Sequence, residues 1–205
     1  MKRNLRLAGL CAGLLVAATL GGCAAVVVGS AVGTALVVTD RRTAGTQLED
    51  QNIELKALTR VRESVGDRGH VNTTSYNRLV LLTGEVQTDT DRSAVEQAVG
   101  RIENVRSIVN ELGVMGASSL TSRSNDTILT SKVKASLIDA KDLQAGAIKV
   151  VTERAVVYLM GRVTEREANR ATDLARGVPG VQKVVKVFEN LTEAELATLG
   201  TETKK

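Results

Sequence analysis

Hydrophobic positions change their period several times between residues 120 and 190. Apolar residues first recur every four positions, which predicts a helix with one buried face. Alternating apolar positions then lie on both sides of Glu153-Arg154, over residues 148–152 and 157–163, and predict a hairpin. A second helical pattern follows, and then an apolar strand over residues 184–188. The predicted order is helix, strand, strand, helix, strand. The apolar positions of the first helix are Leu129, Val133 and Leu137.

Capping signals indicate where these two helices begin and end. Asn125 or Asp126 is expected to cap the first helix. Thr164-Glu-Arg-Glu167 is a capping-box pattern at the start of the second, and Gly177 with Pro179-Gly180 should end it. The second strand, this helix and the last strand form a crossover, so the two strands are expected to be parallel. The helix face toward the sheet should carry Ala168, Ala171, Ala175 and Val178.

The same succession of elements occurs earlier in the chain. Three blocks match in the same order: Val61–Val65 with Val133–Leu137, Val71–Gly84 with Ile148–Gly161, and Ile102–Val105 with Val178–Val181. The fold class is therefore predicted as α+β, with two tandem α-β-β-α-β repeats. Each repeat should have a three-stranded mixed sheet covered by two helices on one face. A repeat of about 65 residues is marginal alone, so we expect the two copies to pack on each other.

The repeats divide the chain into segments. The first repeat is expected over residues 46–114 and the second over 125–190, with a linker at 115–124. Residues 23–45 precede the first repeat as a linker. The tail over 191–205 is expected to form a short helix or to fray, and Gly200 favours fraying.

The amino terminus has the pattern of a secretory signal. Three cations precede an uncharged apolar run over residues 7–20, which ends at Leu20-Gly21-Gly22-Cys23. This ending resembles the bacterial lipobox. The resemblance implies that residues 1–22 are removed, that diacylglycerol joins the Cys23 thiol and that the new amino terminus is acylated. The residue after Cys23 is Ala24 rather than Asp, which by resemblance favours the outer membrane and its periplasmic face.

An uncleaved transmembrane anchor is the alternative for this region. Residues 24–38 are also apolar, so the stretch from Leu7 onward is long enough to span a bilayer. The position of Cys23 and the frequent glycines favour the lipobox.

Composition excludes several kinds of function. Cys11 leaves with the signal, so the mature chain keeps one cysteine and forms no internal disulfide. The full chain has a net charge of +4, and three of its cations leave with the signal, so the mature chain is expected to be close to neutral. The chain has no Trp, one Phe and two Tyr, too few for a stacking platform. Nucleic acid is therefore not an expected partner.

Catalytic equipment is scarce as well. His70 is the one histidine and follows Gly66-Asp67-Arg68-Gly69, which predicts a surface turn leading into a strand. The spacing of His, Cys, Asp and Glu matches no metal-binding motif, and no glycine-rich phosphate loop is present. We expect no catalytic residue, no metal site and no cofactor, and hence no enzyme.

The repeat resembles the BON domain of bacterial periplasmic and osmotically induced proteins. The residues that carry the resemblance are Val80-Leu-Leu-Thr-Gly84, Val157-Tyr-Leu-Met-Gly161, Gly177–Val181, Ser124–Thr127 and the Thr39–Gln47 segment. Nearly all of the mature chain is similar to dual-BON lipoproteins of the division- and outer-membrane-stress-associated, lipid-binding type. This resemblance implies binding of anionic phospholipid and a role in envelope integrity.

Charge indicates which repeat is expected to bind lipid. Residues 46–114 carry a net charge of −3, and residues 125–190 carry +3. A positive domain is drawn to an anionic membrane at about 1 kcal/mol per nearby Lys or Arg. The first helix of the second repeat should present Ile128, Lys132 and Ala135 on one flank. Ile128 stands where the family places an aromatic residue; alternatively, it packs on the first repeat.

Two functions therefore remain. In the first, the second repeat docks on anionic phospholipid while Cys23 anchors the chain. In the second, the lipid is a tether and the repeats bind an envelope protein or cell-wall component. The acidic first repeat suits a protein partner better than a membrane.

Overall fold

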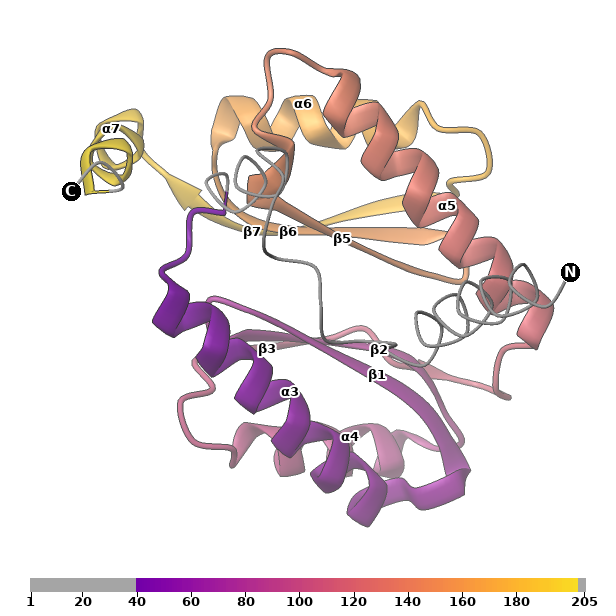
Figure 1. Ribbon diagram of the computed structural model, residues 1–205. Coiled ribbons are helices and arrows are strands. Elements are labelled where there is room, and N and C mark those ends of the chain that lie inside the picture. Colours follow the sequence, from indigo (N-terminus) through magenta and orange to yellow (C-terminus); the bar gives the residue numbers. More distant parts are fainter. Residues whose placement is uncertain (1–39, 203–205) are drawn as a thin grey trace, which may run out of the picture. The chain divides into compact units, whose positions relative to one another are not determined.

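The computed structural model describes residues 40–202, which belong to one compact unit (Figure 1). The predicted signal peptide, Cys23 with its predicted lipids and the alternative membrane anchor lie outside the described residues. Among the described helices, none combines the length and the apolar character needed to cross a membrane.

The first repeat has the predicted order of elements. They are α3 (Ala44–Val65), a 3-10 turn (Gly66–Arg68), β1 (Gly69–Tyr76), β2 (Leu79–Val86), α4 (Asp89–Gly100), β3 (Ser107–Asn110) and β4 (Gly113–Val114). β1 pairs antiparallel with β2, whereas β3 and β4 both pair parallel with β2. The predicted third strand is therefore interrupted at Glu111-Leu112, where the Leu112 side chain turns into the core.

The second repeat repeats this architecture. It comprises α5 (Leu120–Asp139), a 3-10 turn (Ala145–Ala147), β5 (Ile148–Glu153), β6 (Val156–Thr164), α6 (Glu165–Arg176) and β7 (Lys183–Leu191), followed by α7 (Glu193–Glu202). β5 pairs antiparallel and β7 parallel with β6. In each repeat the two long helices cover the same face of the sheet (Figure 1). The α+β prediction is confirmed.

The predictions about helix ends have different outcomes. The capping box of Thr164 and Glu167 is present, and Gly177 caps the end of α6 as expected. The start of α5 was predicted wrongly, because the helix begins at Leu120 with Ser119 as its cap. As far as residue 202, the tail forms α7 instead of fraying. Thr192 and Glu195 cap it reciprocally: each backbone N–H bonds to the other's side chain.

A buried aspartate in each repeat explains the error at α5. Asp126 is buried inside the helix and accepts the backbone N–H groups of Arg154 and Ala155, each at 2.8 Å. Asp50 of α3 does the same for Asn77 and Arg78. All four turn residues have positive φ, the geometry of tight hairpins that non-glycine residues adopt rarely. Each aspartate therefore holds the hairpin turn of its repeat and is not a helix cap.

Each repeat has its own apolar core between its helices and its sheet. The core of the second repeat includes Leu129, Val133 and Leu137, which were the predicted apolar positions of its first helix. It also includes the buried alanines of α6. Small side chains let α6 lie close to the sheet, as expected. The residues of the first core with no exposed surface include Ile53, Ala57, Val80, Leu82, Val95 and Val99.

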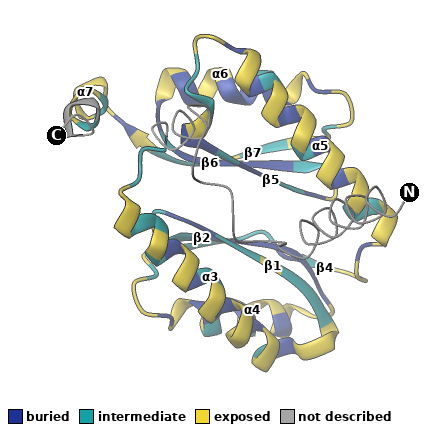
Figure 2. Cartoon of the chain, viewed as in Figure 1, coloured by how far each residue is buried: buried dark blue, intermediate teal, exposed yellow. Residues whose placement is uncertain are grey.

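The opposite faces of the two sheets cover each other. Tyr76 and Leu81 of the first repeat form one buried cluster with Tyr158, Met160 and Val187 of the second. β2 and β6 are consequently buried on both faces (Figure 2). The prediction that the copies pack on each other is confirmed, because one helix layer covers one face of a sheet and leaves the other open.

Residues before α3 tie the two repeats together. Arg41 bonds both carboxylate oxygens of Glu167 in the second repeat, at 2.7 and 2.8 Å. Arg42 bonds Asp50 in the first repeat at 2.8 Å and lies 4.1 Å over the Tyr76 ring. Burial alone would raise the pKa of Glu167, but the Arg41 guanidinium and the Thr164 amide hold it below its usual range. Part of the segment expected to be a linker is therefore integrated into the fold.

Candidate lipid-binding site

The three residues predicted to bind lipid lie on one exposed side of α5. Ile128 is 55% exposed, and Lys132 and Ala135 are also exposed. Positions three and four apart are neighbours on a helix surface, so the three side chains form a continuous strip. We call Ile128, Lys132 and Ala135 the α5 face. The alternative that Ile128 packs on the first repeat is wrong, since more than half of its surface is open.

Lys132 gives the α5 face its charge. Among the described residues, no ion pair includes Lys132, in contrast to Arg170 of α6, which lies 3.0 Å from Asp142. Its neighbours Ile128 and Ala135 are uncharged. An unpaired ammonium on a long side chain beside exposed apolar surface is the arrangement found on helices that lie at a membrane interface.

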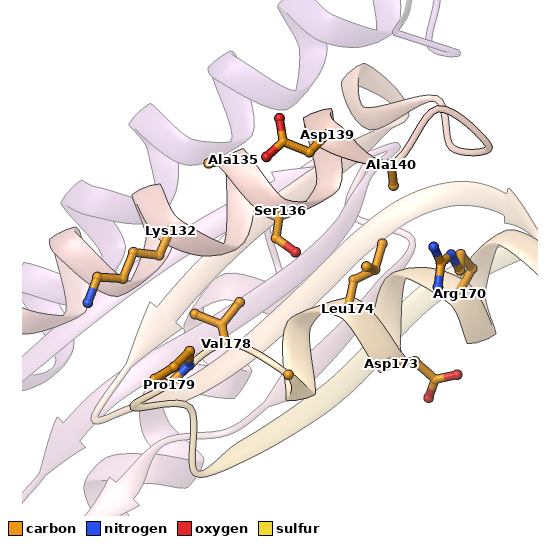
Figure 3. A pocket seen from close by; sticks show the side chains of 11 residues that line it. Lys132, Ala135, Ser136, Asp139, Ala140, Arg170, Asp173, Leu174, Val178 and Pro179 are labelled. Atoms are coloured by element: carbon orange, nitrogen blue, oxygen red, sulfur yellow. The ribbon is translucent and has the colours of Figure 1, made fainter.

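A groove of about 740 Å³ adjoins the α5 face, between α5 and α6 (Figure 3). Ser136 of α5 and Leu174 of α6 point into it from opposite sides, and Lys132 lies at one end. Val178 and Pro179 complete its wall. The lining combines these apolar side chains with the charged side chains of Asp139, Arg170 and Asp173, so the groove offers both apolar surface and charge for binding.

Several residues of this site escaped the sequence reasoning. Ile138 is 67% exposed and lies one turn beyond Ala135, so helical spacing could have identified it. Leu174, Val178 and Pro179 could not have been found in this way. They belong to α6 and the loop after it, and they reach α5 only through the tertiary fold.

Comparison with known proteins places both repeats in one family. The family model of the BON domain matches residues 49–116 and again 125–190. These matches cover the two repeats found from the internal alignment.

Curated relatives extend over most of the chain. The chain is 39% identical to outer membrane lipoprotein DolP of Haemophilus influenzae over 175 residues, which cover 84% of this chain and 90% of the relative. It is 30% identical to the 21 kDa hemolysin of Actinobacillus pleuropneumoniae, covering 73% and 78%. It is 27% identical to osmotically-inducible protein Y of Escherichia coli, covering 68% and 72%. The chain therefore belongs to the BON-domain family, and its two domains group it with the dual-BON outer-membrane lipoproteins.

Proposed function

We propose that this protein is a lipid-anchored lipoprotein on the periplasmic side of the outer membrane, and that its second BON domain docks on anionic phospholipid through the α5 face. The unpaired Lys132 beside exposed Ile128 carries the proposal. In this role the protein supports the integrity of the envelope.

The charge of the two repeats supports docking through the second. Its net charge of +3 favours an anionic surface, and the −3 of the first repeat opposes it. The exposed Ile128 and Ile138 add apolar contact at the level of the headgroups.

The position of the proposed anchor is compatible with this docking. Seventeen residues lie between Cys23 and Arg41, which is held in the fold. A fully extended chain of that length spans at most about 60 Å. The tether therefore keeps the α5 face within reach of the membrane that holds the lipid.

Vesicle binding tests the proposal directly. The soluble protein should comprise residues 39–205, because a chain starting at residue 46 would lack Arg41 and Arg42. We expect it to sediment with phosphatidylglycerol vesicles but not with phosphatidylcholine vesicles. Binding should weaken as the salt concentration rises, because dissolved ions screen the attraction between the protein and the vesicle. At physiological ionic strength this attraction already reaches over only about 8 Å.

Charge reversal locates the contact. Replacing Ile128 and Lys132 together by glutamate should weaken binding to the anionic vesicles by about tenfold or more, since a reversed charge near the surface costs about 2 kcal/mol. Lys56→Glu is the control for the charge reversal at Lys132, because it makes the same reversal at an exposed lysine of the first repeat, on α3. Equal binding by both variants would place the contact elsewhere and contradict the proposal.

A second function is favoured by the surface of α3. Leu48, Leu55 and Leu58 are exposed on this helix, and Leu55 is 67% exposed. Leu55, Leu58 and Val61 line a groove of about 510 Å³ between α3 and β1. An apolar groove on an acidic domain suits a protein partner in the envelope better than an anionic membrane.

Leu55→Glu separates the two functions. We expect this variant to bind phosphatidylglycerol vesicles like the wild type, because its groove lies on the other repeat. In cells it should raise sensitivity to detergent if a protein partner uses the groove. A variant with wild-type detergent resistance would remove the support for this second function.

A further inference from the structure

Three side chains with metal-binding atoms meet where the two repeats face each other. They are His70 of β1, Glu85 of β2 and Glu153 of β5, and their nitrogen and oxygen atoms lie within 4.8 Å of one another. Glu85 is 1% and Glu153 7% exposed. Spacing along the chain did not predict this group, and the prediction that His70 occupies a surface turn was wrong, because it lies in β1 with a side chain that is 26% exposed.

Strand pairing explains how these residues come together. His70 and Glu85 are direct partners in the antiparallel register of β1 and β2. Partners in a sheet point to the same face. On β2 that face also carries Leu81, which packs against the second repeat. Glu153 lies at the end of β5 and reaches the pair from the second repeat.

The Nδ1 atom of His70 lacks a hydrogen-bond partner although it is buried. It lies 3.7 Å from the Oε2 atom of Glu85, which is too far for a hydrogen bond. Buried polar atoms without partners are uncommon and call for an explanation. A separation of 3.7 Å is close to the roughly 3.4 Å between two ligands of a tetrahedral zinc ion with bonds of about 2.0–2.1 Å.

Neighbouring groups orient the two carboxylates. Asn72 donates to Oε2 of Glu153 at 2.9 Å, and the Ser118 amide donates to Oε2 of Glu85 at 3.1 Å. Such bonds to ligand side chains are typical of the outer shell of a metal site. Arg154 bonds the other oxygen of Glu85, at 3.2 Å, and leaves Oε2 on the side of His70.

A cavity gives access to this group. Its volume is about 270 Å³, and its lining includes His70, Glu153, Asn72 and the buried Asp126. Arg123 also lines it, and its Nε donates to the Ser118 hydroxyl. The carboxylates of Glu85, Glu153 and Asp126 carry three negative charges, and the nearby Arg154 and Arg123 carry two positive charges. The net negative charge of these surroundings favours a cation.

We propose that His70, Glu85 and Glu153 form a binding site for a divalent first-row transition metal, with zinc as the ion of best fit. One imidazole nitrogen and two carboxylate oxygens supply three ligands of a tetrahedral site, and water supplies the fourth. The ligand atoms, which lie within 4.8 Å of one another, need to approach by up to about 1.4 Å to reach the separations found around tetrahedral zinc. Because Glu153 belongs to the second repeat, the ion links the repeats.

Zinc titration of residues 39–205 tests the site cleanly. This part of the chain contains no cysteine and His70 is its one histidine, so an untagged protein has no other strong zinc ligand. Equilibrium dialysis should yield one zinc ion per chain, and zinc should raise the melting temperature. His70→Asn and Glu153→Gln should each weaken binding at least tenfold. Asn72→Ala should weaken it about tenfold through loss of the outer-shell bond.

Two controls keep the test decisive. Glu103→Gln removes an exposed carboxylate of the first repeat and should bind zinc like the wild type. Far-UV circular dichroism checks that each variant is folded. If the wild type binds less than one zinc ion, or binds it no more tightly than His70→Asn, the proposed site is refuted. Cobalt with a tetrahedral visible spectrum in the wild type, absent in Glu153→Gln, would support it independently.

Discussion

Replacing Gly84 by alanine should lower the free energy of unfolding by about 4 kcal/mol or more. Gly84 lies in β2 with φ of +109°, a backbone conformation that residues with a side chain rarely adopt. A Cβ atom there would lie 2.0 Å from the carbonyl oxygen of His70 on β1. Backbone strain and the clash with a neighbouring strand each cost about 1–3 kcal/mol, so the first repeat should unfold at much lower urea concentration.

Two further glycines test this explanation. A Cβ atom at Gly161, the matching position of β6, would lie 2.5 Å from the carbonyl oxygen of Ala147, so Gly161→Ala should destabilise the second repeat. At Gly116 a Cβ atom would meet nothing within 4 Å, so Gly116→Ala should change stability by less than about 0.5 kcal/mol. If urea denaturation showed that Gly84→Ala and Gly116→Ala lower the free energy of unfolding equally, steric crowding against β1 would not explain the effect of Gly84→Ala.

Replacing Asp50 by alanine should lower the free energy of unfolding by about 4 kcal/mol. The carboxylate is buried and accepts the Ser75 hydroxyl at 2.6 Å, the turn amides of Asn77 and Arg78, and the Arg42 guanidinium. Its loss would take this acceptor from the Ser75 hydroxyl and the two turn amides and would release the strained turn, while Arg42 would keep its bonds to Asp40. Thermal or urea unfolding followed by circular dichroism measures the effect.

Asp126→Ala and Asp67→Ala are the comparison variants. Asp126 holds its turn by two backbone amides without a cation, so its loss should cost about 2 kcal/mol. Asp67 is exposed in the 3-10 turn, and its replacement should have little effect. A loss of less than 1 kcal/mol for Asp50→Ala would contradict the assigned role.

The same contacts make stability depend on pH. Burial alone would raise the pKa of Asp50, but the Ser75 hydroxyl, the Arg78 and Asn77 amides and Arg42 lower it below its ordinary value of 3.8. A depressed pKa means that the folded state holds the charged form more strongly than the unfolded chain. This stabilisation is complete above about pH 4 and is lost as the pH falls through the folded pKa. Asp50→Ala should therefore lose less stability than the wild type below pH 4.

The sequence alone determined the architecture of this protein. Periodicity predicted the elements of both repeats, because a helix or strand with one buried face repeats its apolar residues at the period of its backbone. Gly84 and Gly161 aligned the repeats, and the close strand contacts at these positions give the alignment its physical basis. The exposed side of α5 followed from helical spacing, since the neighbouring face had to enter the core.

Local signals were ambiguous wherever one residue type serves two purposes. Asp126 has the chemistry of a helix cap, but its carboxylate bonds a turn that lies 28 residues further along the chain. Thr192-x-x-Glu195 is a capping-box pattern that outweighs Gly200, and the tail forms a helix where fraying was favoured.

The tertiary structure alone decided which elements and side chains pack against each other. Nothing in strand alternation indicates that Tyr158 and Met160 pack against the other repeat, that α6 completes the groove beside Lys132, or that Arg41 reaches Glu167. His70, Glu85 and Glu153 are likewise far apart along the chain and meet where the sheets face each other. Periodicity reports which side of an element is buried, but the partner that buries it depends on how the two repeats pack together.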